Sequence, residues 1–87
     1  MVTVTFPPAL QRHVPCAAVE VVASTVREAL LAACEQWPRV RGYLLDDSGA
    51  LRPHVAVFVD GAVTARSLQA PLAAKARVDV LQALSGG

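Results

Sequence analysis

The residues of this chain that most clearly suggest chemistry are the last three of the sequence, Ser85, Gly86 and Gly87. The last two residues have no side chains, so the functional group they offer is the Gly87 carboxylate. Because glycine has no Cβ, such a segment can run extended through a channel too narrow for other residues. The pattern predicts a tail that presents a carboxylate to the active site of a partner. The alternative interpretation is a frayed terminus, since domain ends commonly tolerate glycine.

Other candidates for chemistry are few and scattered along the chain. Cys16 and Cys34 lack CxxC spacing and a neighbouring histidine cluster. We expect Cys34 to be a small core residue, whereas Cys16 follows a proline in a segment that could expose it. We expect His54 to lie on the surface, too far from His13 to form a metal site.

The sequence contains no P-loop, no Gly-rich dinucleotide fingerprint and no nucleophile elbow. We therefore expect no catalytic residue, no bound cofactor and no metal site on this chain.

Composition narrows the class of protein. A length of 87 residues predicts one domain, and 54% hydrophobic with 17% charged residues excludes a disordered chain. The apolar runs are too short to span a bilayer, and the first residues do not form a signal peptide, so we expect a cytoplasmic protein. The net charge is +1, and the basic residues are scattered, which argues against a nucleic-acid partner. We also expect no membrane partner.

The first part of the chain predicts two strands and one helix. Residues 2–6 alternate valine and phenylalanine with threonine, the period of a half-buried strand. Residues 9–16 are expected to form a loop or wide hairpin connection, and residues 17–22 a strand antiparallel to the first. Thr25 followed by Glu28 predicts a capping box, and Pro38 ends the helix that begins there. The helix carries one apolar stripe, formed by Val26, Ala29, Leu30, Ala33, Cys34 and Trp37.

The second part predicts a hairpin and a last strand. Residues 53–59 alternate around three valines, and Asp60 with Gly61 favours a tight type I′ turn. The remaining expectations are a helical turn at 43–45, a turn at 46–49, a returning strand at 62–65, a loop at 67–74 and a strand at 77–81.

Together these elements predict an α+β fold. A right-handed crossover after the first hairpin lets the first and last strands pair in parallel at the centre of a mixed sheet of four to five strands, with one main helix on one face. This is the β-grasp arrangement of ubiquitin, and we expect it over residues 1–84, followed by a tail at 85–87. The predicted core consists of Val4, Phe6, Val21, Val26, Leu30, Ala33, Trp37, Val55, Val57, Val78 and Val80.

Strand alternation also predicts which residues lie on the sheet face away from the helix. With Val55 and Val57 directed inward, Phe58 faces outward, and with Val80 inward Leu81 does the same. We expect Phe58, Leu81, Ala83 and Leu84 to form an apolar docking surface at the root of the tail. The alternative is that these are ordinary isolated surface residues.

The chain resembles the ThiS/MoaD family of ubiquitin-like sulfur carriers over nearly its whole length. The segments that carry the resemblance are 2–7, 24–30, 51–61, 71–72 and 78–87. The chain departs from the family pattern in two places. Relatives usually have an acidic or glycine-containing turn where this chain has Ala74-Lys75-Ala76, and often a proline where it has Gln82. The length of segment 51–61 is more similar to MoaD-like and cysteine-forming carriers than to the short thiamine type.

The resemblance implies a carrier and substrate, not an enzyme. A ubiquitin-activating-type enzyme would use ATP to adenylate Gly87, and a sulfur donor would convert the adenylate to a thiocarboxylate. A sulfur-acceptor synthase would then make cysteine or another sulfur-containing metabolite. Three alternatives stay open: the small subunit of molybdopterin synthase, a protein modifier conjugated through Gly87, and a β-grasp binding module without tail chemistry.

Overall fold

The computed structural model describes residues 1–63 and 68–82. Ala83, Leu84 and the predicted tail therefore lie outside the described residues, as do residues 64–67. The elements in chain order are β1 (Val2–Thr5), α1 (Pro8–Gln11), β2 (Val19–Val21), α2 (Val26–Gln36), the 3-10 turn η1 (Pro38–Val40), α3 (Arg41–Leu44), β3 (Val55–Val59), β4 (Ala62–Val63) and β5 (Arg77–Gln82).

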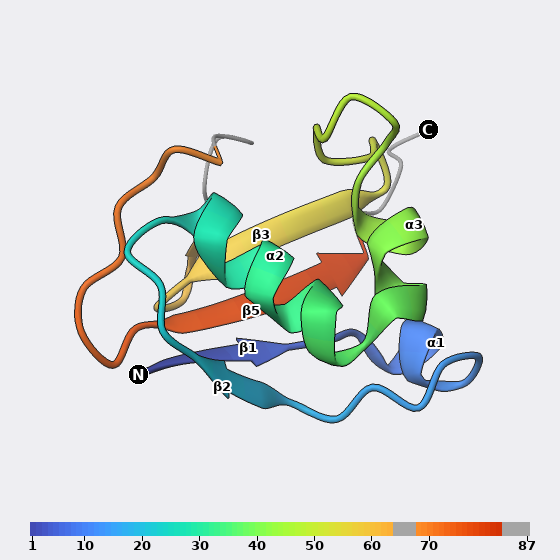
Figure 1. Ribbon diagram of the computed structural model, residues 1–87, viewed down its shortest axis with the longest axis horizontal. Coiled ribbons are helices and arrows are strands. Elements are labelled where there is room, and N and C mark those ends of the chain that lie inside the picture. The colour runs from blue at the N-terminus through green and yellow to red at the C-terminus, as the bar shows by residue number, and fades with distance from the viewer. Residues whose placement is uncertain (64–67, 83–87) are drawn as a thin grey trace.

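The five described strands form one mixed sheet in the order β2-β1-β5-β3-β4. β1 and β5 pair in parallel at its centre, whereas β1 with β2, β3 with β5 and β3 with β4 are antiparallel. The helix α2 lies across one face of this sheet (Figure 1). The predicted β-grasp arrangement is confirmed.

The connection between the first two strands differs from the prediction. Residues expected to form a loop begin with the short helix α1, which has Pro8 in its first turn. Proline suits that position because its missing N–H would have no partner inside the helix. Leu10 and Val14 are directed into the core, and so is Cys16, which is only 2% exposed. The proline-flanked segment could have exposed Cys16 but does not, because it packs against the domain instead of looping away from it.

The start of α2 is capped from two sides. The Thr25 hydroxyl accepts the Glu28 N–H at 3.2 Å, as predicted. The Glu28 carboxylate, however, accepts from the N–H and hydroxyl of Ser24 rather than from the cap amide. These bonds lower the pKa of Glu28. The next free amides, those of Val26 and Arg27, donate to carbonyl groups of segment 68–70. The loop before β5 therefore supplies acceptors that a helix N-terminus lacks on its own.

The end of α2 follows the proline rule. The helix stops at Gln36, and Trp37 leaves the helical conformation before Pro38 opens η1. The continuation through η1 and α3 is longer than the single helical turn predicted. Trp37 is only half-buried, and its indole N–H donates to the Ala17 carbonyl at 3.0 Å. The assignment of Trp37 to the core was wrong. Its indole N–H must reach a backbone acceptor, so the ring lies at the edge of the core.

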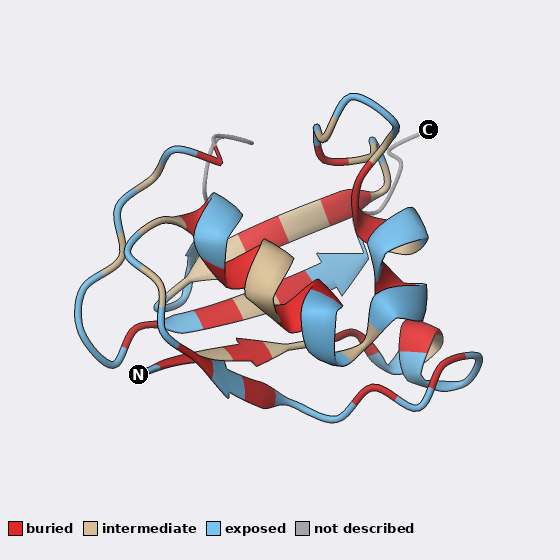
Figure 2. Ribbon diagram, in the orientation of Figure 1, coloured by how far each residue is buried: buried red, intermediate tan, exposed pale blue. Residues whose placement is uncertain are grey.

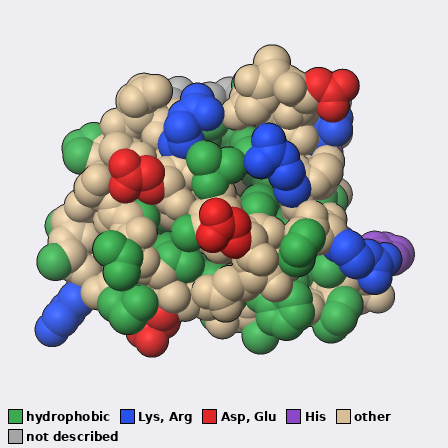
Figure 3. Space-filling model, viewed as in Figure 1, with side chains coloured by type: hydrophobic (Ala, Val, Ile, Leu, Met, Phe, Trp, Pro, Cys, Tyr) green, Lys and Arg blue, Asp and Glu red, His purple; other side chains and the backbone are tan. Residues whose placement is uncertain are grey.

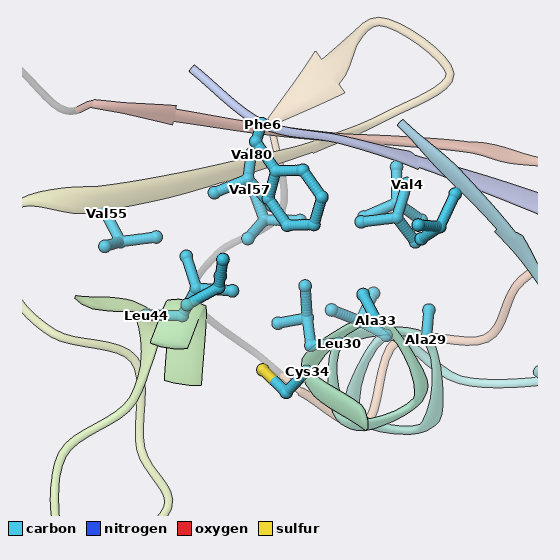
Figure 4. Close-up of a cluster of buried hydrophobic side chains, with 14 of the residues drawn as sticks. Val4, Phe6, Ala29, Leu30, Ala33, Cys34, Leu44, Val55, Val57 and Val80 are labelled. Atoms are coloured by element: carbon cyan, nitrogen blue, oxygen red, sulfur yellow. The ribbon is translucent and has the colours of Figure 1, made fainter. Parts of the chain in front are cut away.

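The core fills the space between the sheet and the helices. Leu30 and Ala33 of α2 point toward Val4, Val57 and Val80 of the sheet (Figure 4). Burial alternates along each central strand, so that every second residue is in the core (Figure 2). All predicted core residues except Trp37 are buried. Among the described residues, the buried hydrophobic side chains outside the predicted core list are Val2, Leu10, Val14, Cys16, Val19, Ala29, Cys34, Val40, Leu44, Leu45, Leu51, Leu68 and Ala76.

The β3–β4 hairpin has the predicted turn. Val59 pairs with Ala62, and the two residues between them have positive φ, 50° at Asp60 and 87° at Gly61. Positive φ at both positions defines the type I′ turn. The Asp60 carboxylate accepts the Arg77 N–H at 2.8 Å, and the Asp60 N–H donates to the Arg77 carbonyl. The turn thereby fixes the start of β5, the strand that leads to the tail.

Candidate functional site

The face of the sheet opposite α2, called here the outer face, holds the predicted docking residues that the structure describes. The register pairs Phe58 with Val63 of β4 on one side and with Asp79 of β5 on the other, while Ala56 pairs with Leu81. Paired residues share a face of the sheet. Ala56, Phe58, Val63 and Leu81 therefore form one group, called here the apolar patch.

Accessibility of the apolar patch is uneven. Val63 is 66% exposed and Leu81 40% exposed, whereas Ala56 and Phe58 are half-buried. The prediction that Phe58 and Leu81 face outward on the same side is confirmed, but Ala83 and Leu84 lie outside the described residues. Sequence reasoning missed Val63, although the two-residue turn at Asp60 and Gly61 already fixes it opposite Phe58.

The outward-facing residues of β1 and β2 are polar. Thr3 and Thr5 of β1 and the exposed Glu20 of β2 lie there. Between the two halves runs β5, with Arg77, Asp79 and Leu81 directed outward. The sheet thus offers an apolar region beside β3 and β4 and a polar region beside β1 and β2.

Asp79 sits at the boundary of these halves and is held by two donors. The Thr5 hydroxyl and the Arg77 Nε–H both donate to its Oδ1, at 2.6 and 2.8 Å. Burial raises the pKa of Asp79, but the hydrogen bonds from Thr5 and Arg77 and the charge of Arg77 outweigh it, so the net effect is a lowered pKa. Asp79 is therefore ionised at neutral pH.

The cysteines and His54 do not form a reactive site. Cys16 and Cys34 are both buried and free, and burial raises the pKa of each thiol, with the charge of Arg41 opposing the shift at Cys34. The prediction of Cys34 as a core residue is confirmed. His54 is half-buried and packs edge-on against Tyr43 of α3, with ring centroids 4.8 Å apart and planes at 81°.

Charge on the helix side is dispersed. Arginine and acidic side chains alternate with apolar ones over α2 and its surroundings, with no stripe of one sign (Figure 3). Within residues 1–63 and 68–82, no group of three histidine, cysteine or acidic residues is placed to hold a metal ion. No helix of that same part is long and apolar enough to cross a membrane.

Comparison with solved structures shows which folds this one is similar to. SAMP1 of Haloferax volcanii aligns with a TM-score of 0.83 and 24% identity, covering 99% of this chain and 98% of its own. CysO of Amycolatopsis orientalis, solved in complex with BexX, aligns over the whole of both chains with the same score and identity. CysO of Mycobacterium tuberculosis aligns with a TM-score of 0.81 and 22% identity, covering 97% of this chain and all of its own.

The fold is ubiquitin-like. No protein-family model matches the sequence, and no curated protein matches it, so the likeness is one of structure. These alignments, each below 25% identity, support the β-grasp fold that the sequence predicted.

Proposed function

We propose that this protein is a ubiquitin-like sulfur carrier whose working group is the Gly87 carboxylate. The observation that carries the proposal is the position of β5. This strand is paired on both sides, with β1 and β3, and ends at Gln82, five residues before Gly87 (residues 83–87). The full-length likeness to SAMP1 and CysO structures supports the same conclusion. The chain acts as carrier and substrate, not as the enzyme.

The chemistry follows from the properties of a carboxylate. A terminal carboxyl group with a pKa of about 3.5 is ionised at neutral pH and resists nucleophiles. Its oxygen attacks the α-phosphorus of ATP in the active site of an adenylating enzyme, and pyrophosphate leaves. Sulfide then attacks the carbonyl carbon of the mixed anhydride and AMP leaves with its bond electrons, which yields the thiocarboxylate and one proton. Because this activation consumes ATP, the proposal places the carrier in the cytoplasm.

The thiocarboxylate then gives its sulfur to an acceptor synthase that makes cysteine or another small sulfur-containing metabolite. A second candidate function is conjugation of Gly87 to a lysine of another protein, favoured by the likeness to a structure described as small archaeal modifier protein 1. Both functions begin with the same acyl-adenylate. The two functions differ in the nucleophile, a sulfur donor or a lysine, that finally receives the activated Gly87 carbonyl.

The short tail sets where the partner touches the domain. Five extended residues span about 17 Å at most. An enzyme that holds the Gly87 carboxylate must therefore also lie against the sheet end near Leu81 and Gln82. The apolar patch lies there, and Leu81 belongs to it. We expect the adenylating enzyme to cover the apolar patch, together with Ala83 and Leu84 at the root of the tail.

Reconstitution tests the proposal. The purified chain is incubated with a ubiquitin-activating-type enzyme from the same organism, ATP and sulfide, and its intact mass is measured. The expected product carries one sulfur in place of one oxygen at Gly87. Deletion of Gly86 and Gly87 is expected to abolish the change. An unchanged mass contradicts the carrier proposal. In a parallel reaction that also contains cell extract, attachment of the chain to other proteins would indicate conjugation instead.

Docking is tested with a matched pair of variants. Phe58→Ala with Leu81→Ala removes the centre of the apolar patch and is expected to weaken binding to the adenylating enzyme. Val22→Ala is the control, because Val22 is 83% exposed but follows β2 at the opposite edge of the sheet. Thermal unfolding of each variant establishes that the domain is intact. Equal affinities for both variants would contradict docking at the patch.

A further inference from the structure

Asp79 occupies an unusual place on the outer face. It lies between Thr5 on β1 and Phe58 on β3, and Leu81 follows two residues later on its own strand. Its side chain is only 21% exposed. A carboxylate thus borders the apolar patch directly, at the point where the apolar and polar halves of the face meet.

Only one of the two carboxylate oxygens of Asp79 accepts hydrogen bonds from described residues. Both donors, the Thr5 hydroxyl and the Arg77 Nε–H, reach Oδ1. Among the described residues, none donates a hydrogen bond to Oδ2. Thr5 and Arg77 therefore hold the carboxylate in a fixed orientation while one oxygen stays available to an external donor.

This arrangement matters once a partner covers the apolar patch. Water is then displaced from around Asp79, and an ionised oxygen without a partner would lose its solvation without compensation. Arg77 does not donate to Oδ2. Its side chain is 63% exposed, and its Nε–H is already bonded to Oδ1. The compensation must come from a donor on the partner, and a cation satisfies a carboxylate best.

We propose that Asp79 is a specificity-determining residue that selects an adenylating enzyme carrying an arginine or lysine opposite Oδ2, beside an apolar surface that fits the patch. The proposal rests on the proposed function, since it identifies the partner by its action on Gly87. Thr5 and Arg77 are positioning residues for this contact. An enzyme of the same class that presents an acidic or purely apolar surface there is rejected.

The test measures the apparent KM of the adenylating enzyme for the carrier by ATP–pyrophosphate exchange, at low and at moderate salt. Asp79→Asn keeps an oxygen for Thr5 but removes the charge, and is expected to raise KM about 10-fold or more while leaving kcat at saturation unchanged. Glu20→Gln is the matched control, because it removes an exposed acid from the same face beyond β1 and is expected to leave KM unchanged. For the unsubstituted chain KM is expected to rise with salt, and this measurement needs no variant.

The outcomes separate this inference from the proposed function. If Leu81→Ala raises KM but Asp79→Asn does not, the patch is used without a cation and the inference is overturned while the carrier function stands. If Glu20→Gln raises KM as much as Asp79→Asn, only general charge attraction operates, and the inference is likewise overturned. If the unsubstituted chain is not adenylated at all, the proposed function fails and the inference falls with it.

Discussion

Leu30 offers a direct test of which face of the sheet is covered and which is free. It lies in the middle of α2, is fully buried and points at the central strands (Figure 4). Leu30→Ala removes its transfer free energy and leaves a cavity, which together cost about 2 to 5 kcal/mol. In a domain of this size, such a loss lowers the melting temperature by about 8 to 40 °C. Chemical unfolding in urea, followed by circular dichroism, gives the free energy of unfolding.

The neighbouring Leu31 is the matched control, because the chemical change is the same and the residue is only partly buried. Leu31→Ala is expected to cost about 1 kcal/mol or less. If both substitutions cost the same, the helix does not face the sheet as described, and the assignment of the outer face loses its basis.

Three further predictions concern acid stability, the thiols and a turn. Because the folded pKa of Asp79 lies below its unfolded value, its carboxylate stabilises the fold above about pH 4, and this contribution is lost as the pH falls through the folded pKa. Asp79→Asn should therefore lower the free energy of unfolding at pH 7 and have little effect near pH 2; an equal effect at both would refute the account. Cys16 and Cys34 should react with a thiol reagent only after unfolding, and rapid labelling of the native protein would contradict their burial. Gly61→Ala should destabilise by about 1 to 2 kcal/mol in urea unfolding because its φ is 87°, whereas Gly42→Ala in α3 should not, since each added Cβ meets open space.

The alternation of residues predicted most of the fold because it reports burial directly. The period of two in β3 and β5 placed Val57 and Val80 in the core, and the period of α2 did the same for Leu30. The turn at Asp60 and Gly61 could be predicted because few residues accept positive φ. Alternation and turn signals come from neighbouring residues. The order of the strands in the sheet was then predicted from the rule that crossover connections are right-handed.

What the sequence did not predict depends on contacts between distant segments. Segment 68–70 caps α2 through its backbone carbonyls, which no residue type reveals. The burial of Cys16 depends on how the segment after α1 packs. The bond from Thr5 to Asp79 joins residues 74 positions apart and requires the parallel register of β1 and β5. Part of the apolar patch could be predicted, because alternation along a strand assigns each residue to a face of the sheet. Its polar border at Asp79 could not, because it depends on how β5 is aligned with β1 and β3.

The central claim is tested most directly on the protein purified from its own host. Trypsin cleaves after Arg77, so the last peptide begins at Val78 and its mass reports the state of Gly87. The account predicts that a fraction of this peptide ends at Gly87 with one sulfur in place of one oxygen, and that the fraction disappears when the adenylating enzyme is deleted. A peptide that continues beyond Gly87, or that carries only an ordinary carboxylate in both strains, would contradict it.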